Sequence, residues 1–183
     1  MKELLKRTDE RKKVRMSSTR RLTFLAFSVA VALVVAFVES MLPSLPIAPG
    51  AKLGLSNIAP LFVLIVLGVG DAFTVMILKC LLSATLSGGL TGLMYSLPAG
   101  LASLAVETVL MLFVFDRMSI AGISLVGAVV FNAVQLVPAS LITGVNLIML
   151  LPFMIAAGIM AGAFTGLLTY YTVKKLPYSV YGQ

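Results

Sequence analysis

Few side chains in this 183-residue sequence could carry out acid–base or metal chemistry. There is no histidine and only one cysteine, Cys80, and no two aspartates lie close together. Imidazole ligands, a Ser/His or Cys/His catalytic pair and a magnesium-binding aspartate cluster are therefore all missing. We expect no catalytic residue, no metal site and no cofactor. The seven acids are Glu3, Asp9, Glu10, Glu39, Asp71, Glu107 and Asp116.

Polar residues inside hydrophobic runs are better candidates for function. Lys79 and Glu107 each interrupt such a run, and a charge at mid-bilayer costs about 2.5–3.5 kcal/mol on insertion scales. A helical rise of about 1.5 Å per residue puts them at similar depths, about 10 and 12 Å from the inner surface. One interpretation is a structural Lys79–Glu107 ion pair. The alternatives are a Lys79 that binds an anionic substrate group and a proton-coupled pair.

Asn132 and Gln135 lie three residues apart, on one face of a helix that also carries small residues. Such side chains often make interhelical hydrogen bonds, but two at the level of a long external loop also suit the wall of a polar pocket. A solvated membrane rim is the simpler alternative. The residues predicted to contact a small-molecule substrate are Glu39, Lys52, Asn57, Lys79, Tyr95, Asn132 and Gln135.

The elements that must position these residues are membrane helices. The chain is 60% hydrophobic and 11% charged, with a mean hydropathy of +1.07, far from the balance of soluble domains. A spanning helix needs roughly 20 apolar residues. The sequence predicts an all-α polytopic protein with six transmembrane helices, at about 22–42, 57–70, 72–88, 91–115, 119–142 and 147–171.

Basic residues predict the orientation. Twelve of the 14 fall in parts that would be cytoplasmic, against one, Lys52, in the external loops. By the positive-inside rule both termini face the cytoplasm, and the helices cross the cell membrane. The basic block before the first helix is expected to contact lipid headgroups, not nucleic acid.

The predicted organisation has three parts. A basic cytoplasmic tail covers 1–21, a six-helix transmembrane domain covers 22–172, and a cytoplasmic C-terminal tail covers 173–183. The external loop 43–56 contains three prolines, which stiffen the chain. We interpret it as a lid over a ligand, with Glu39 and Lys52 as its polar contacts.

Two helices carry rows of small residues. The first has Ala26 and Ala30, then Ala32 and Ala36, and the sixth has glycines at 158, 162 and 166. Small residues four apart let membrane helices approach closely. Packing within the chain is the simpler interpretation for the glycines, whereas the alanines suit a separate membrane partner equally well.

These features together resemble a known group. Six helices in fewer than two hundred residues, alanine rows behind a basic N-terminus and a long Pro/Gly-rich first loop resemble the S components of energy-coupling factor (ECF) transporters. More specifically, "PGAKLGLSN", "LKCLLSATLSGG", "MYSLPAG" and "FNAVQL" resemble the Gx transporter family, also called heptaprenyl diphosphate synthase component I. The resemblance covers about 22–172. Lys79 and Phe131 depart from that family's pattern, in which arginine and histidine are frequent there.

The resemblance implies a subunit that binds a small vitamin, cofactor or precursor from outside. It would associate through Ala26, Ala30, Ala32 and Ala36 with a membrane coupling protein that carries two ATPases. The chain lacks a GxxxxGK[ST] loop, so ATP hydrolysis would come from those partners. The synthase name implies instead a non-catalytic membrane subunit associated with isoprenoid synthesis. The charge of the substrate stays open, because Glu39 suits a cation and Lys52 or Lys79 an anion.

Overall fold

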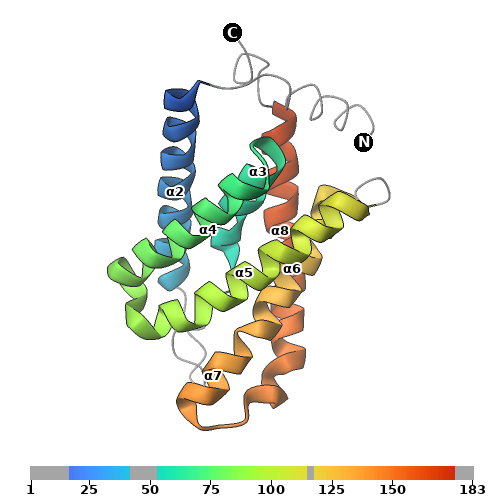
Figure 1. Cartoon of the computed structure of the whole chain (residues 1–183). Helices are drawn as coiled ribbons and strands as arrows, with labels where there is room; N and C mark the ends of the chain where they lie inside the picture. Colours follow the sequence, from blue (N-terminus) through green and yellow to red (C-terminus); the bar gives the residue numbers. More distant parts are fainter. Residues whose placement is uncertain (1–16, 42–52, 115–117, 176–183) are drawn as a thin grey trace.

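The computed structural model describes residues 17–41, 53–114 and 118–175, and the regular structure within these ranges is entirely helical (Figure 1). The prediction of an all-α fold is therefore confirmed for the described residues. The elements are α2 (Ser18–Ser40), η1 (Leu55–Asn57), α3 (Ile58–Val66), α4 (Val69–Ser83), η2 (Ala84–Gly88), α5 (Gly89–Phe113), α6 (Ile120–Val134), α7 (Leu136–Thr143), η3 (Leu147–Leu150) and α8 (Leu151–Lys175).

Five stretches of this helical structure are long and apolar enough to cross a membrane, so the chain is a multi-pass membrane protein. They are Ser18–Ser40, Val69–Leu86, Gly89–Phe113, Ile120–Thr143 and Leu147–Lys175. The segment predicted as a span at 57–70 is instead the shorter apolar helix Leu55–Val66. Its length at 1.5 Å per residue is about 18 Å, well below the ~30 Å of a hydrocarbon core. Six spans are therefore not confirmed.

The short helix is fixed between longer ones. It packs against α2, α4 and α8, and it turns into α4 at Gly68, whose φ of 110° lies in the region that glycine adopts most readily. In Figure 1 α3 runs toward the end of the molecule at which α2 begins and α8 ends. In the first turn of this short helix, Ser56 and Asn57 are buried.

An ion pair joins α2 to α4 near the start of both helices. The Arg21 guanidinium donates to both carboxylate oxygens of Asp71, with Nε to Oδ2 at 2.9 Å and Nη2 to Oδ1 at 2.5 Å. Asp71 is buried, whereas Arg21 is half exposed. The first residues of α2 are thereby fixed against the α3–α4 turn.

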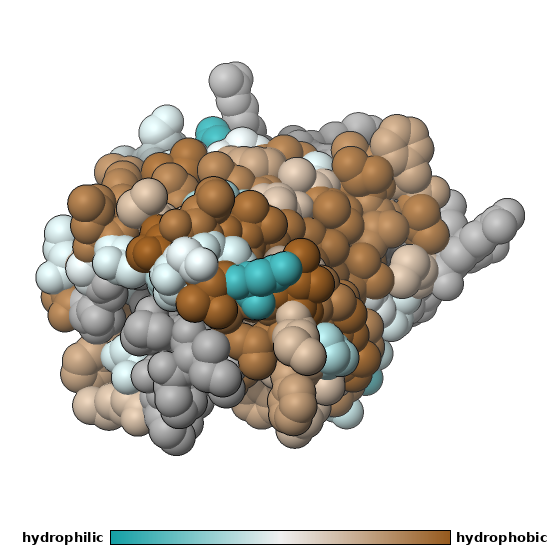
Figure 2. Space-filling model, turned by 90° about the horizontal axis from the view of Figure 1, so that it is seen from below, coloured by the Kyte–Doolittle hydropathy of each residue, from teal (hydrophilic) through white to brown (hydrophobic). Residues whose placement is uncertain are grey.

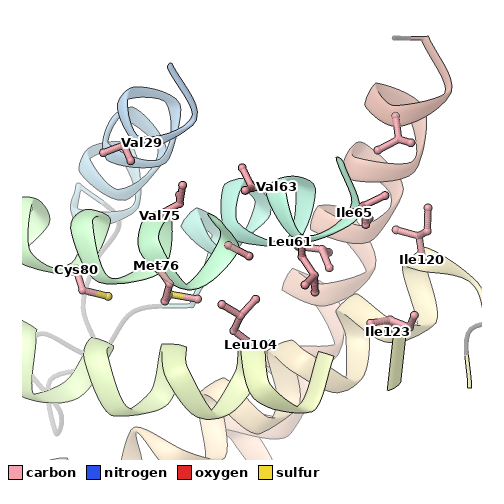
Figure 3. Close-up of a cluster of buried hydrophobic side chains, with 13 residues drawn as sticks. Val29, Leu61, Val63, Ile65, Val75, Met76, Cys80, Leu104, Ile120 and Ile123 are labelled. Atoms are coloured by element: carbon pink, nitrogen blue, oxygen red, sulfur yellow. The ribbon is translucent and has the colours of Figure 1, made fainter. Parts of the chain in front are cut away.

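The main hydrophobic core lies among α2, α3, α4 and α5, with contributions from α6 and α8. Figure 3 shows Val29 of α2, Leu61 of α3 and Leu104 of α5 meeting Val75 and Met76 of α4. These side chains are at most 7% exposed. A second, smaller cluster surrounds Tyr95 and joins α5 to α7, η3 and α8.

The glycine row of α8 packs within the chain. A Cβ added to Gly162 would stand 2.6 Å from the Cα of Leu125, and one added to Gly166 would stand 2.6 Å from the Cα of Ala121. Both contacts are with the backbone of α6, which cannot move aside as a flexible side chain could. The close α6–α8 packing therefore accounts for these glycines without a separate partner.

Much of the outer surface is hydrophobic, as a lipid environment requires. Figure 2, a view from below, shows brown hydrophobic residues over most of that face, with a small hydrophilic group near its middle. Large exposed apolar side chains occur on α2, α4, α5, α7 and α8, among them Phe27 of α2, Phe113 of α5 and Phe153 of α8. Such a continuous apolar surface would be a liability in water.

Candidate functional site

A buried polar network surrounds the segment from Leu53 to Asn57, which leads into α3. Glu39, at the end of α2, accepts hydrogen bonds from the backbone N–H groups of Gly54 (2.5 Å), Leu55 (3.4 Å) and Ser56 (3.5 Å). Glu39 is only 5% exposed. Its carboxylate thus serves as the acceptor for a helix N-terminus from a different part of the chain.

Two helix dipoles explain this contact. Glu39 lies in the last turn of α2, where the helix dipole is unfavourable for an anion. The first N–H groups of the Leu55–Val66 helix have no partners within their own helix and favour a negative charge. Gly54, with φ 83°, makes the turn that points these groups at Glu39. Phe131 covers this glycine, since a Cβ there would stand 2.8 Å from its ring.

Lys79 of α4 approaches the same segment from the other side. Its ammonium group donates to Ser56 Oγ at 3.1 Å and to the side-chain oxygen of Asn57. Lys79 is 4% exposed, so these acceptors replace water around a buried charge. Ser56 was not among the predicted substrate residues, although it precedes Asn57 in the block "PGAKLGLSN".

Glu107 of α5, the predicted partner of Lys79, is also buried, at 3% exposed. Its side chain fills the space over Gly127 of α6, where an added Cβ would stand 2.5 Å from Glu107 Cγ. A structural Lys79–Glu107 ion pair stays a prediction. What the structure adds is that Lys79 also donates to the α3 N-terminal segment, which the sequence did not indicate.

Asn132 and Gln135 of α6 complete the network, and both are at most 1% exposed. Asn132 donates through Nδ2 to the carbonyl oxygen of Leu53 at 3.2 Å, and it accepts from Gln135 Nε2 at 2.9 Å. Gln135 Nε2 also lies 3.8 Å from the sulfur of Met154. Asn132 therefore connects α6 to the same segment that Glu39 and Lys79 contact.

The remaining two predicted substrate residues are Tyr95 and Lys52. Tyr95 is buried in the second hydrophobic cluster, beside Leu136 and Met154. Lys52 and most of the proposed lid, 43–56, fall outside the described residues. Ser56 and Asn57, by contrast, are buried at the start of the short helix, where they contact Lys79.

The four alanines of α2 divide into two pairs. Ala32 and Ala36 are buried, at 0% and 3% exposed, and so pack within the chain. Ala26 and Ala30 are exposed on the other face. The physical reason is that the two rows are six residues apart, which places them on different sides of a helix. A contact with a separate partner is kept as a proposal for Ala26 and Ala30 only.

Two hollows occur away from the network. One of about 240 Å³ lies between α2, α3 and α8, lined by Phe27, Ile58 and Thr169 among others. Another, of about 580 Å³, lies along α6, α7 and η3, lined by Ser140 and Asn146 among mainly apolar residues. Neither is lined by a predicted substrate residue.

Comparison with known proteins gives one match. A family model described as heptaprenyl diphosphate synthase component I matches residues 28–172, which takes in α2 beyond its first turns, the whole polar network and most of α8. No curated protein and no solved structure matches the chain.

Proposed function

The chain belongs to the heptaprenyl diphosphate synthase component I family, and from this membership we propose that it is a non-catalytic substrate-binding subunit of an ECF-type transporter. It captures a small vitamin, cofactor or precursor molecule from outside the cell. Partner subunits then drive uptake with ATP. Both termini face the cytoplasm, and the end of α2 that carries Glu39 faces outward.

One observation supports this proposal above the others. Polar side chains from α2, α4 and α6 converge on the Leu53–Asn57 segment, which adds two buried polar side chains of its own, although each of the five is expensive to bury in a membrane protein. Polar groups concentrated at one place in an apolar bundle are typical of a binding site for a polar small molecule. The five are Glu39, Ser56, Asn57, Lys79 and Asn132.

The family description supports a role within a larger assembly, since it names one component of a system. We propose that the partners are an ECF membrane coupling protein and two ATPase subunits. The exposed face of α2 around Ala26 and Ala30 is the proposed contact, because small residues permit close approach of a partner helix.

The alternative is a non-catalytic membrane subunit associated with isoprenoid synthesis. The wording of the family description favours it. This alternative predicts that the chain copurifies with an acid-rich soluble synthase subunit and that prenyl diphosphate synthesis depends on the complex. The transporter proposal predicts neither result.

Reconstitution tests the proposal directly. The chain is coexpressed with ECF coupling and ATPase subunits, purified in mild detergent and placed in liposomes, and native mass spectrometry identifies any small molecule that copurifies. We expect a stable complex and ATP-dependent uptake of the identified molecule. Failure to copurify with these subunits, together with a complex with a prenyl synthase subunit, would reject the transporter function.

A matched pair of variants locates the partner contact. The double variant Ala26→Leu with Ala30→Leu replaces the small side chains of the exposed face by large ones. It should reduce copurification with the coupling protein at least tenfold. Val31→Leu adds a methylene group to an exposed position of α2 that lies about 100° around the helix from Ala30, and it should leave copurification unchanged. Equal effects of both would contradict the proposed contact.

A further inference from the structure

The N-terminus of the Leu55–Val66 helix is an anion-binding position that the chain itself occupies. The N–H groups of Gly54, Leu55 and Ser56 all donate to Glu39, and the Lys79 ammonium lies next to them, bonded to Ser56 Oγ. Backbone donors, a helix dipole and a buried cation act together here. Each of these favours a negatively charged group.

One side-chain hydrogen-bond donor at this position has no acceptor. Asn57 is 7% exposed, and its Nδ2 atom is buried without a hydrogen-bond partner in the described part of the chain. Its other amide atom, Oδ1, accepts from Lys79. A buried N–H group without an acceptor is destabilising, so its persistence calls for an explanation.

The unpartnered amide is directed at the same turn that holds Glu39. Nδ2 of Asn57 lies 3.2 Å from the point at which a Cβ on Gly54 would stand. Gly54 also gives the shortest of the three hydrogen bonds to Glu39. Glu39 therefore satisfies the backbone donors of the turn but leaves the adjacent side-chain donor without an acceptor.

We propose that this helix N-terminus, with Asn57 and Lys79, binds a carboxylate or phosphate group of the small-molecule substrate, and that Glu39 holds the position when no substrate is bound. The proposal rests on the proposed binding function and adds the charge of the substrate to it. An anion with several oxygens accepts from the Gly54 turn and from Asn57 Nδ2 together, which the single carboxylate of Glu39 does not.

Glu39 is suited to such a placeholder role by its position. It lies in the last turn of α2, one residue before the end of the helix, so a small rotation of its side chain releases the carboxylate. Its own helix does not stabilise the charge there. A competing anion therefore displaces a carboxylate that is stabilised only by the neighbouring helix.

Chemical rescue of the purified full-length chain tests this. Glu39→Ala removes the internal carboxylate, and Glu39→Gln serves as a second variant that keeps an acceptor oxygen if the first does not fold. Thermal unfolding in detergent is measured with sodium acetate, inorganic phosphate or sodium chloride at equal ionic strength. An anion present at about ten times its Kd should raise Tm by about 3–6 °C in these variants. The wild type should respond by less than about 1 °C, because Glu39 occupies the position.

A third variant isolates the unpartnered donor. Asn57→Asp keeps an oxygen for Lys79 but replaces the N–H donor by an acceptor, so in the Glu39→Gln background it should abolish the response to both anions. No response above chloride in either Glu39 variant would overturn the proposal, and so would an equal response of the wild type or of the Asn57→Asp double variant. Stabilisation by phosphatidylglycerol over phosphatidylcholine, without any by acetate or phosphate, would assign the anion to a lipid headgroup and overturn the substrate assignment.

The outcome is separable from that of the proposed function. The rescue uses the chain alone and needs neither ATPase partners nor uptake. A chain that binds anions but supports no uptake would retain the site without the transporter role. A chain that takes up a neutral or cationic molecule without anion rescue would retain the transporter role and lose this site.

Discussion

Removal of the Lys79 ammonium should destabilise the protein through the loss of its hydrogen bonds to the α3 segment. Lys79 is 4% exposed and donates to Ser56 Oγ and Asn57 Oδ1. Lys79→Met keeps a long, flexible side chain of similar length but offers no donor. Both acceptors would then lie buried without that partner.

The magnitude follows from these two acceptors. A buried polar group left unsatisfied costs about 1–3 kcal/mol, so the loss of one donor to two groups should cost about 2–6 kcal/mol. For a chain of this length that corresponds to a Tm about 4–24 °C lower. Leu78→Met, on the partly exposed face of the same helix, is the matched control and should change stability by less than about 0.5 kcal/mol.

A double-mutant cycle measures whether the contact with Asn57 carries this effect. Asn57→Leu removes the acceptor, so the double variant Lys79→Met with Asn57→Leu no longer leaves Asn57 Oδ1 buried without a donor. We expect the double variant to be more stable than the sum of the single effects predicts, by about 1–3 kcal/mol. Thermal unfolding followed by size-exclusion fluorescence provides the measurement. Additivity within about 0.5 kcal/mol would refute the reasoning, since it would mean that the two side chains do not depend on each other.

Three further predictions use contacts in the helix interfaces. Gly162→Val should lower Tm by about 2–12 °C, because its new side chain would collide with the backbone of α6, and failure to lower it would contradict the close α6–α8 packing. Gly127→Ala should lower Tm by a similar amount by displacing the Glu107 side chain, and Glu107→Ala in the same chain should restore part of the loss. Asp71→Asn should lower Tm by about 1–4 °C, since its Arg21 partner is half exposed, and the difference from wild type should shrink in 1 M salt.

Much of the fold could be predicted because the signals are local. Apolar runs long enough for a bilayer marked the five spans, and the position of each differs from the structure by only a few residues. The same length criterion leaves the segment 57–70 unconfirmed as a span, since its helix is shorter than the five others. Membership of the family could also be predicted from the block that starts at Pro49, and the family match confirms it.

The candidate site could be predicted in part. Lys79 and Asn132 were recognisable because a polar residue in an apolar run is costly and needs a reason. Glu39 and Asn57 were recognisable because they stand where the first apolar run ends and the second begins. Their partners could not be predicted. Glu39 was expected to face a ligand, but in this structure its carboxylate accepts from three backbone N–H groups of the chain itself.

Spacing along the chain determined which residues share a helix face, and bilayer thickness determined how deep each lies. Helix rotation, tilt and the path of the connecting chain depend on packing between segments far apart in sequence, and only the tertiary structure decided them. The two alanine rows of α2 illustrate the difference: the sequence makes them chemically equivalent, whereas the packing of the other helices against α2 buries Ala32 and Ala36 and leaves Ala26 and Ala30 exposed. Likewise the sequence put Lys79 inside the membrane, and the fold brought Ser56 and Asn57 to it.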